Sequence, residues 1–188
     1  MSIQFDKVQP KNKAQLKSLI EYAFNNNIYD LNFIDTSKIT DMSWLFGNVK
    51  HNFDISSWDV SNVTNMSAMF YYCKIFDCDL SNWDVSNVTN MNHMFFSCVN
   101  FDIKCFESWD VSNVTDMTSM FAFCNKFDCD LSNWDVSNVT GMFFMFGHCK
   151  QFNCDLSRWN TSKVKDMKDM FTYCNKLTIP DWYKKHIK

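Results

Sequence analysis

Glycine and proline are almost absent from this chain, with three and two residues among 188. Glycine is the usual residue where a tight turn needs a positive φ, so its scarcity indicates that the turns here rest on other residues. Aromatic residues, in contrast, make up 17% of the chain. The composition therefore predicts a large core and few glycine-built turns.

Long apolar runs are also missing. No stretch approaches the roughly 18 apolar residues of a membrane-spanning helix, and the first residues show no basic segment followed by an apolar run, the mark of a secretory signal. We therefore expect no membrane insertion, and an intracellular location is favoured.

A continuous basic region is the third absence. The formal net charge is −3, divided into +1 for residues 1–50, −9 for residues 51–157 and +5 for residues 158–188. General nucleic-acid binding needs a continuous basic face. An acidic body with a basic C-terminal end therefore argues against a nucleic-acid partner.

Catalytic groupings are not visible either. The four histidines have no serine, cysteine or carboxylate at a suggestive spacing, and the repeated Asp and Ser residues look structural. We predict that the protein is not an enzyme, with no catalytic residues and no cofactor.

Internal repetition is the dominant positive feature. Residues 81–89 return unchanged as residues 132–140, and a degenerate copy at 34–40 precedes the other repeats. The tryptophan of the motif recurs at intervals of 25, 26, 25 and 25 residues, a period typical of repeat arrays. These tryptophans, which we expect in the core, are Trp58, Trp83, Trp109, Trp134 and Trp159.

Each repeat has two halves with different periodicity. The half around the tryptophan alternates apolar and polar residues, which predicts a short strand. In the other half Met91, Met94, Phe95 and Cys98 have the spacing 0, 3, 4 and 7, which predicts a helix or a tighter 3₁₀ turn. We therefore expect an α/β repeat solenoid with a parallel sheet on one face and short helices or 3₁₀ turns on the other.

The two ends differ from the repeats. Residues 1–32 are expected to form an N-terminal helical cap, in which Leu16, Leu19, Ile20 and Ala23 share one apolar face. Residues 33–176 would hold about six repeats of about 25 residues. Residues 177–188 start a further strand, lose the register and end in a basic tail, so we expect a C-terminal cap.

The repeat motif Trp-Asp-Val-Ser-Asn-Val-Thr-Asn-Met-x-x-Met-Phe-x-x-Cys resembles the BspA-like leucine-rich-repeat family, in the variant common in mycoplasma lipoproteins and other bacterial surface proteins. The resemblance covers about residues 31–177. It implies a right-handed leucine-rich-repeat coil that acts in adhesion or host-protein binding, without catalytic residues. Such proteins are often surface-exposed, which the expected intracellular location does not match.

The nine cysteines follow the repeat and are odd in number. We interpret them as buried thiols, since disulfide frameworks use paired cysteines. A ladder of cysteines that run in one direction lacks the paired spacing of a zinc site, so no metal is expected. One column holds Cys73, Cys98, Cys124, Cys149 and Cys174, and a second holds Cys78, Cys129 and Cys154, with Cys105 near it.

A column of aspartates is the first candidate binding site. Strand alternation predicts that Asp59, Asp84, Asp110 and Asp135 point away from the core, where stacked carboxylates ~5 Å apart would repel one another. Three explanations are open. The carboxylates could accept hydrogen bonds from the adjacent Ser-Asn turns, bind a basic peptide or protein, or hold cations such as calcium.

The second candidate lies in repeat five. Phe143 and Phe144 occupy positions where another repeat has Ser67 and Ala68. Exposed aromatic patches often mark interaction sites, although these rings could equally pack between neighbouring helices. Further aromatic residues follow nearby in the repeats, namely Tyr71, Tyr72, Phe96, Phe123 and Tyr173.

The sequence as a whole predicts a non-enzymatic repeat scaffold that binds a protein partner. The alternative is a structural or self-assembling protein, in which the acidic body of one copy contacts the basic C-terminal end of the next.

Overall fold

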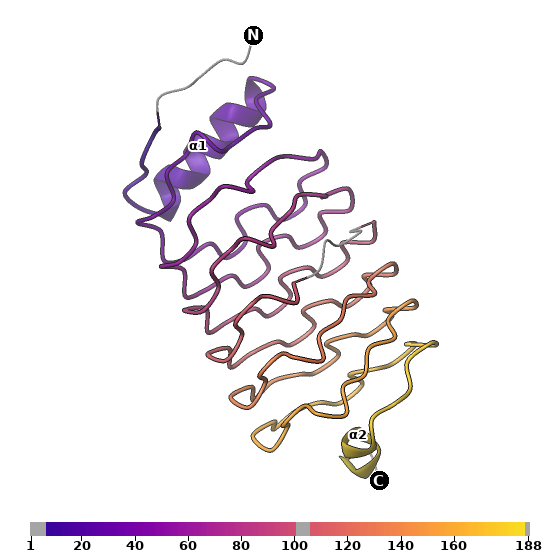
Figure 1. Cartoon of the computed structure of the whole chain (residues 1–188). Coiled ribbons are helices and arrows are strands. Elements are labelled where there is room, and N and C mark those ends of the chain that lie inside the picture. Colours follow the sequence, from indigo (N-terminus) through magenta and orange to yellow (C-terminus); the bar gives the residue numbers. More distant parts are fainter. Residues whose placement is uncertain (1–6, 101–105, 187–188) are drawn as a thin grey trace.

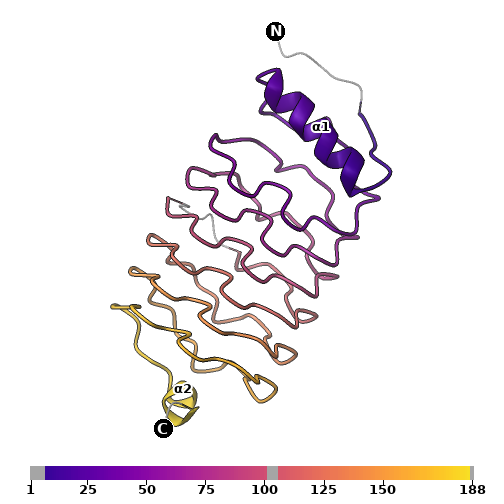
Figure 2. The same cartoon turned by 180° about the vertical axis from the view of Figure 1, so that it is seen from behind.

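The computed structural model of the chain describes residues 7–100 and 106–186, where the repeats stack as layers between two helices (Figure 1). Helix α1 (Lys13–Asn25) lies at the N-terminal end of the stack and helix α2 (Asp181–His186) at the opposite end (Figure 2). Cys105 and the last two residues of the basic tail lie outside the described residues. We number six layers in chain order as residues 30–53, 54–78, 79–100, 106–129, 130–154 and 155–180.

The expected α/β solenoid with a parallel sheet is wrong. Within residues 7–100 and 106–186 the regular elements are α1 and α2, with no strand and no 3₁₀ helix. Parallel pairing is confined to isolated bridges, such as those that join Asn65 to Asn90 and Asn90 to Asp116. The expected leucine-rich-repeat coil, with helices or 3₁₀ turns on its second face, is wrong for the same reason. The layers are built from turns.

Hydrogen bonds inside each layer explain why no strand forms. The Val88 N–H donates to the Val85 carbonyl at 2.9 Å, and the Trp83 N–H donates to the Leu80 carbonyl at 3.1 Å. These bonds close tight turns with N–H groups that a strand would offer to its neighbour. The predicted alternation of side chains is nevertheless confirmed, because Trp83 and Val85 are buried and Asp84 is exposed.

The methionine-rich half is not helical because two positions in each layer have a positive φ. In layer two these are Ala68 at 53° and Tyr72 at 58°. The Met69 N–H donates to the Met66 carbonyl at 3.2 Å, and the positive φ at the third residue is that of a type II turn. The N–H groups of Met66, Ala68, Phe70 and Tyr72 all donate to carbonyls of layer three at 2.8 or 2.9 Å. Bonds between layers therefore replace helical bonds.

The positive φ of Ala68 gives a first prediction. A left-handed conformation costs a residue with a Cβ about 1–2 kcal/mol, which roughly offsets the entropy and the buried methyl group lost in a change to glycine, about 1.5 kcal/mol together. Ala68→Gly should thus change the free energy of unfolding by less than about 0.5 kcal/mol. Ala122→Gly, at a buried position without positive φ, should lose about 1.5 kcal/mol. Equal losses in urea denaturation would contradict this assignment of strain.

Two aromatic ladders form the core. Each repeat tryptophan is 3–4% exposed and donates its Nε1–H to a carbonyl of the preceding layer at 3.0–3.4 Å. The expectation that the tryptophans are core residues is confirmed. One phenylalanine per layer stacks on the next with ring centroids 5.3–5.8 Å apart, and the six are Phe46, Phe70, Phe95, Phe121, Phe146 and Phe171.

Helix α1 covers the first layer. Asn12 caps it by accepting the Gln15 N–H at 3.0 Å, and Leu16, Ile20 and Ala23 are buried. The amphipathic face predicted for this helix is thus confirmed, although Leu19 is only partly buried.

Helix α2 covers one corner of layer six. Its Trp182 donates Nε1–H to the Leu156 carbonyl at 2.8 Å, as the repeat tryptophans do, and its Tyr183 ring lies 5.0 Å from Phe171. The strand expected to start in residues 177–183 is wrong, because Asp181 begins this helix.

Candidate interaction surface

The predicted column of aspartates is exposed, and each carboxylate is bonded within its own layer. Asp84 Oδ1 accepts the Ser86 N–H at 3.0 Å and the Ser86 hydroxyl at 2.6 Å. Asp59 makes the same pair of bonds with the serine two residues on. The serine N–H bond recurs at Asp110 and Asp135, at 3.0 and 2.9 Å. The local bonds that the sequence analysis proposed are therefore present.

These bonds outweigh the repulsion between neighbouring carboxylates. The serine hydroxyl and then the serine N–H lower the pKa of Asp84, Asp110 and Asp135 below the usual 3.8. The charge of Asp110 raises the pKa of Asp84 and Asp135, but by less. In the part of the chain that the structure describes, no three His, Cys, Asp or Glu side chains are grouped to hold a metal ion. A basic partner on this column stays a prediction.

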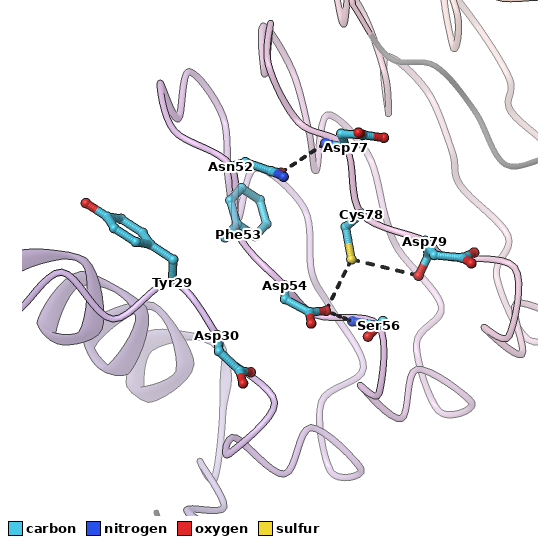
Figure 3. Close-up of a pocket in the computed structure, with 9 residues that line it drawn as sticks. All are labelled: Tyr29, Asp30, Asn52, Phe53, Asp54, Ser56, Asp77, Cys78 and Asp79. Atoms are coloured by element: carbon cyan, nitrogen blue, oxygen red, sulfur yellow. Dashed lines mark hydrogen bonds between the residues drawn. The ribbon is translucent and has the colours of Figure 1, made fainter. Parts of the chain in front are cut away.

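An acidic groove opens at another corner of the layers, where Asp54 and Asp77 lie close to Cys78 (Figure 3). Its volume is about 440 Å³. Several of its polar atoms are used within the fold: the Cys78 thiol donates to Asp54 Oδ1 at 3.5 Å, and Asn52 Oδ1 accepts the Asp77 N–H at 3.0 Å. A groove of about 490 Å³ around Cys154 repeats these contacts three layers later. This repetition indicates a feature of the repeat rather than one active site.

The thiols of the first cysteine column are buried hydrogen-bond donors. Cys124, for example, donates to the Phe95 carbonyl of the preceding layer at 3.0 Å, and burial raises its pKa to about 12. A thiol with so high a pKa forms almost no reactive thiolate at neutral pH. The five cysteines of this column are all buried thiols outside any disulfide, so their role is in packing.

An aromatic strip runs across all six layers on the methionine-rich face. Six of its rings, one from each layer, contact one another in sequence with centroids 4.4–5.3 Å apart: Trp44, Tyr71, Phe96, Phe123, His148 and Tyr173. Four further rings contact these six or each other: Tyr72, His93, Phe143 and Phe144. We call these ten residues the aromatic strip.

Backbone conformation and two glycines hold the rings of the strip at the surface. Trp44 and Phe144 have φ values of 57° and 54°, and each ring lies over a glycine three residues later. A Cβ added to Gly147 would lie 2.4 Å from the Phe144 ring, and one added to Gly47 would lie 3.3 Å from Trp44. Two of the three glycines in the chain thus make room for rings of the strip.

The sequence identified this surface only in part. Phe143 and Phe144 were candidates, and the structure places both in the strip, whereas Trp44 and His148 were missed. The six contacting rings stand in different columns of the repeat, so no single column is uniformly aromatic: Trp44 aligns with Ala68, and Phe123 aligns with Tyr72. The signal in the sequence that could have revealed the strip is an aromatic ring in every repeat, at any position between the first methionine and the cysteine.

These features define a repeat protein with a periodic aromatic surface. The family model described as "Mycoplasma protein of unknown function, DUF285" matches residues 14–107 and 100–188, and the chain belongs to this family. No curated protein and no solved structure matches the chain. The resemblance to BspA-like proteins stays a prediction. Neither helix in the described residues is long and apolar enough to cross a membrane.

Proposed function

We propose that the protein is a non-enzymatic scaffold that binds a protein partner through the aromatic strip. The observation that carries this proposal is the continuity of the strip, since every layer supplies a ring that contacts the next. Trp44 and Tyr173 are 57% and 61% exposed, and Tyr72 and Phe143 are each 37% exposed. Large contiguous aromatic surfaces are uncommon except where something binds, and Trp, Tyr and Phe are enriched at protein interfaces.

The rigidity of the strip supports the same proposal. Phe123 is held between Phe96 at 5.3 Å and His148 at 4.5 Å, and its backbone is fixed by a hydrogen bond from its N–H to the Gly147 carbonyl at 2.7 Å. Rings that are already ordered lose little conformational entropy on binding. A preorganised aromatic surface is therefore well suited to act as an anchor.

A peptide library provides the test. Random peptides displayed on phage are selected against the whole chain, and the enriched peptides are titrated by fluorescence anisotropy. The strip variant replaces four exposed rings by asparagine, which the repeat itself places as Asn48 at the position of Tyr72 and Tyr173, and as Asn92 at the position of Phe143. We expect binding at least ~10-fold weaker with an unchanged melting temperature. The substitutions are Trp44→Asn, Tyr72→Asn, Phe143→Asn and Tyr173→Asn.

The control variant changes the other candidate face. Asp84→Asn combined with Asp110→Asn alters exposed carboxylates of the aspartate column and should leave the dissociation constants unchanged. Failure to enrich any peptide, or equal affinity of the strip variant and the unchanged protein, would refute the proposal. Loss of binding in the aspartate variant alone would move the site to the aspartate column.

The self-assembling alternative stays a prediction. The basic C-terminal end holds Lys184 and Lys185 within α2, but the opposite end exposes Lys11 just before α1 and Lys17 within it. Direct contact between the two ends of neighbouring copies would therefore bring like charges together.

A further inference from the structure

The face that carries the aromatic strip is almost free of acidic residues. It is formed in each layer by the ten residues that begin at the first methionine. These are residues 42–51, 66–75, 91–100, 117–126, 142–151 and 167–176. These stretches contain six lysines and one acidic residue, Asp169, and therefore carry +5. Since the whole chain carries −3, the remainder carries −8. The aromatic face is thus a basic surface on an acidic protein.

Five of the lysines form a row along one side of the strip, one in every layer except the third. All five are exposed: Lys50, Lys74, Lys126, Lys150 and Lys176. The Lys74 ammonium lies 5.8 Å from the centre of the Tyr72 ring, which shows how close the row comes to the strip. We call these five residues the lysine row.

A hollow of about 380 Å³ lies where the lysine row meets the strip in layers one and two. Lys50 and Lys74 line it together with the partly exposed Tyr72 and Ile75. The hollow thus offers positive charge beside apolar surface. A carboxylate side chain with neighbouring apolar groups matches both features.

We propose that the aromatic strip and the lysine row bind an extended acidic segment of the partner protein, an inference that rests on the proposed function. Carboxylates of the segment pair with the lysine row, and its apolar side chains cover the strip. Six layers spaced ~4.8 Å apart extend over ~24 Å. An extended chain rising ~3.4 Å per residue covers that distance with about seven residues.

Ring orientation favours a carboxylate over a nucleobase. Tyr71 and Phe96 stack with their planes at 14°, and Phe123 and His148 stack at 16°. The faces of these four rings are therefore turned toward each other, so their edges remain for a ligand, while Phe96 and Phe123 meet at 64° between the two pairs. Aromatic edges carry partial positive charge, which attracts carboxylates, whereas single-stranded nucleic acids stack their bases on ring faces.

The charge of the remaining surface favours a short acidic segment over a long polyanion. A nucleic acid that extended beyond the strip would meet the remainder of the chain, which carries −8. An extended segment of about seven residues ends within the basic face. Charge complementarity of this kind selects partners and speeds their association.

Synthetic peptides of about eight residues test the inference. In three labelled peptides tyrosine alternates with glutamate, glutamine or lysine, and oligothymidine of about ten nucleotides is the fourth probe. We expect the glutamate peptide to bind at least ~10-fold more tightly than the glutamine peptide, with an advantage that shrinks as salt rises. The row variant should lose this advantage and keep its affinity for the glutamine peptide. Its substitutions are Lys50→Gln, Lys74→Gln, Lys126→Gln and Lys150→Gln.

The control variant neutralises four exposed lysines outside this face and should keep the preference for glutamate: Lys11→Gln, Lys17→Gln, Lys38→Gln and Lys165→Gln. If the glutamine or lysine peptide binds as tightly as the glutamate peptide or more tightly, and the strip variant still binds more weakly, the acidic partner is overturned. The proposed function then still stands. Tighter binding of oligothymidine than of the glutamate peptide also overturns the inference. If no peptide depends on the strip, both proposals fail.

Discussion

Phe121→Ala is expected to lower the free energy of unfolding by about 3–5 kcal/mol, a large part of the 5–15 kcal/mol that typically stabilises a domain. The Phe121 ring is fully buried at the middle of the phenylalanine ladder. It lies 5.7 Å from both Phe95 and Phe146, and 4.2 Å from Phe127. Each layer contacts only its neighbours, so a cavity at this position weakens the joint between the two halves of the stack.

Phe171→Ala is the matched control at the end of the same ladder. Phe171 has a ladder neighbour on one side only, Phe146 at 5.8 Å, with Tyr183 of α2 at 5.0 Å on the other. Helix α2 is short and can close over the cavity more readily than a packed layer. We expect a smaller loss than for Phe121→Ala in guanidinium denaturation followed by tryptophan fluorescence. If both variants lose the same free energy of unfolding, a ring in the middle of the ladder contributes no more to stability than a ring at its end, which would contradict this prediction.

The side-chain pattern could be predicted from the sequence more fully than the backbone. Alternation around Trp83 and Asp84 correctly assigned the buried and exposed sides, because a repeat must place identical residues in identical surroundings. The spacing 0, 3, 4 and 7 of Met91, Met94, Phe95 and Cys98 correctly indicated one buried face, and all four are buried. What the pattern could not distinguish was a helix from consecutive turns that bury the same four positions.

The turns escaped prediction because their usual sequence signal is missing. Positive φ values normally call for glycine or asparagine, whereas here they occur at residues such as Ala68, Ser119 and Phe123. The strain of each is about 1–2 kcal/mol, and hydrogen bonds to the next layer compensate for it. Such bonds depend on the stack as a whole, so no local window of sequence reveals them. The aromatic strip was missed in part for the same reason, since its rings meet only across layers.

Acid is expected to unfold the protein in two steps. Burial lowers the pKa of His93 below 6.5, so stability falls slightly as the pH drops below that value. A larger loss follows below pH 3.8, because the pKa of each of nine aspartates is lower in the folded chain than this usual value. They are Asp35, Asp41, Asp54, Asp84, Asp110, Asp130, Asp135, Asp155 and Asp181. The unfolded chain binds more protons here, so stability is fully present above pH 3.8 and is lost as the pH falls through the folded values.

Asparagine in the aspartate column separates the charge of the carboxylates from their hydrogen bonds. Layer six already carries Asn160, whose Oδ1 accepts the Ser162 N–H at 3.2 Å, so an amide can take the place of the carboxylate. The variant with Asp84→Asn, Asp110→Asn and Asp135→Asn should lose a little stability in urea at pH 7, because the bonds that lower the pKa of these carboxyls favour the charged form, and its stability should fall less than that of the unchanged protein as the pH drops below 3.8. These three positions no longer titrate, and the repulsion around Asp110 is removed. An equal fall of stability in acid for the variant and the unchanged protein would contradict this prediction. A loss at pH 7 as large as that of a core substitution would show instead that the turns need the charged carboxylate, which would make the column a structural ladder that tolerates asparagine only at its end.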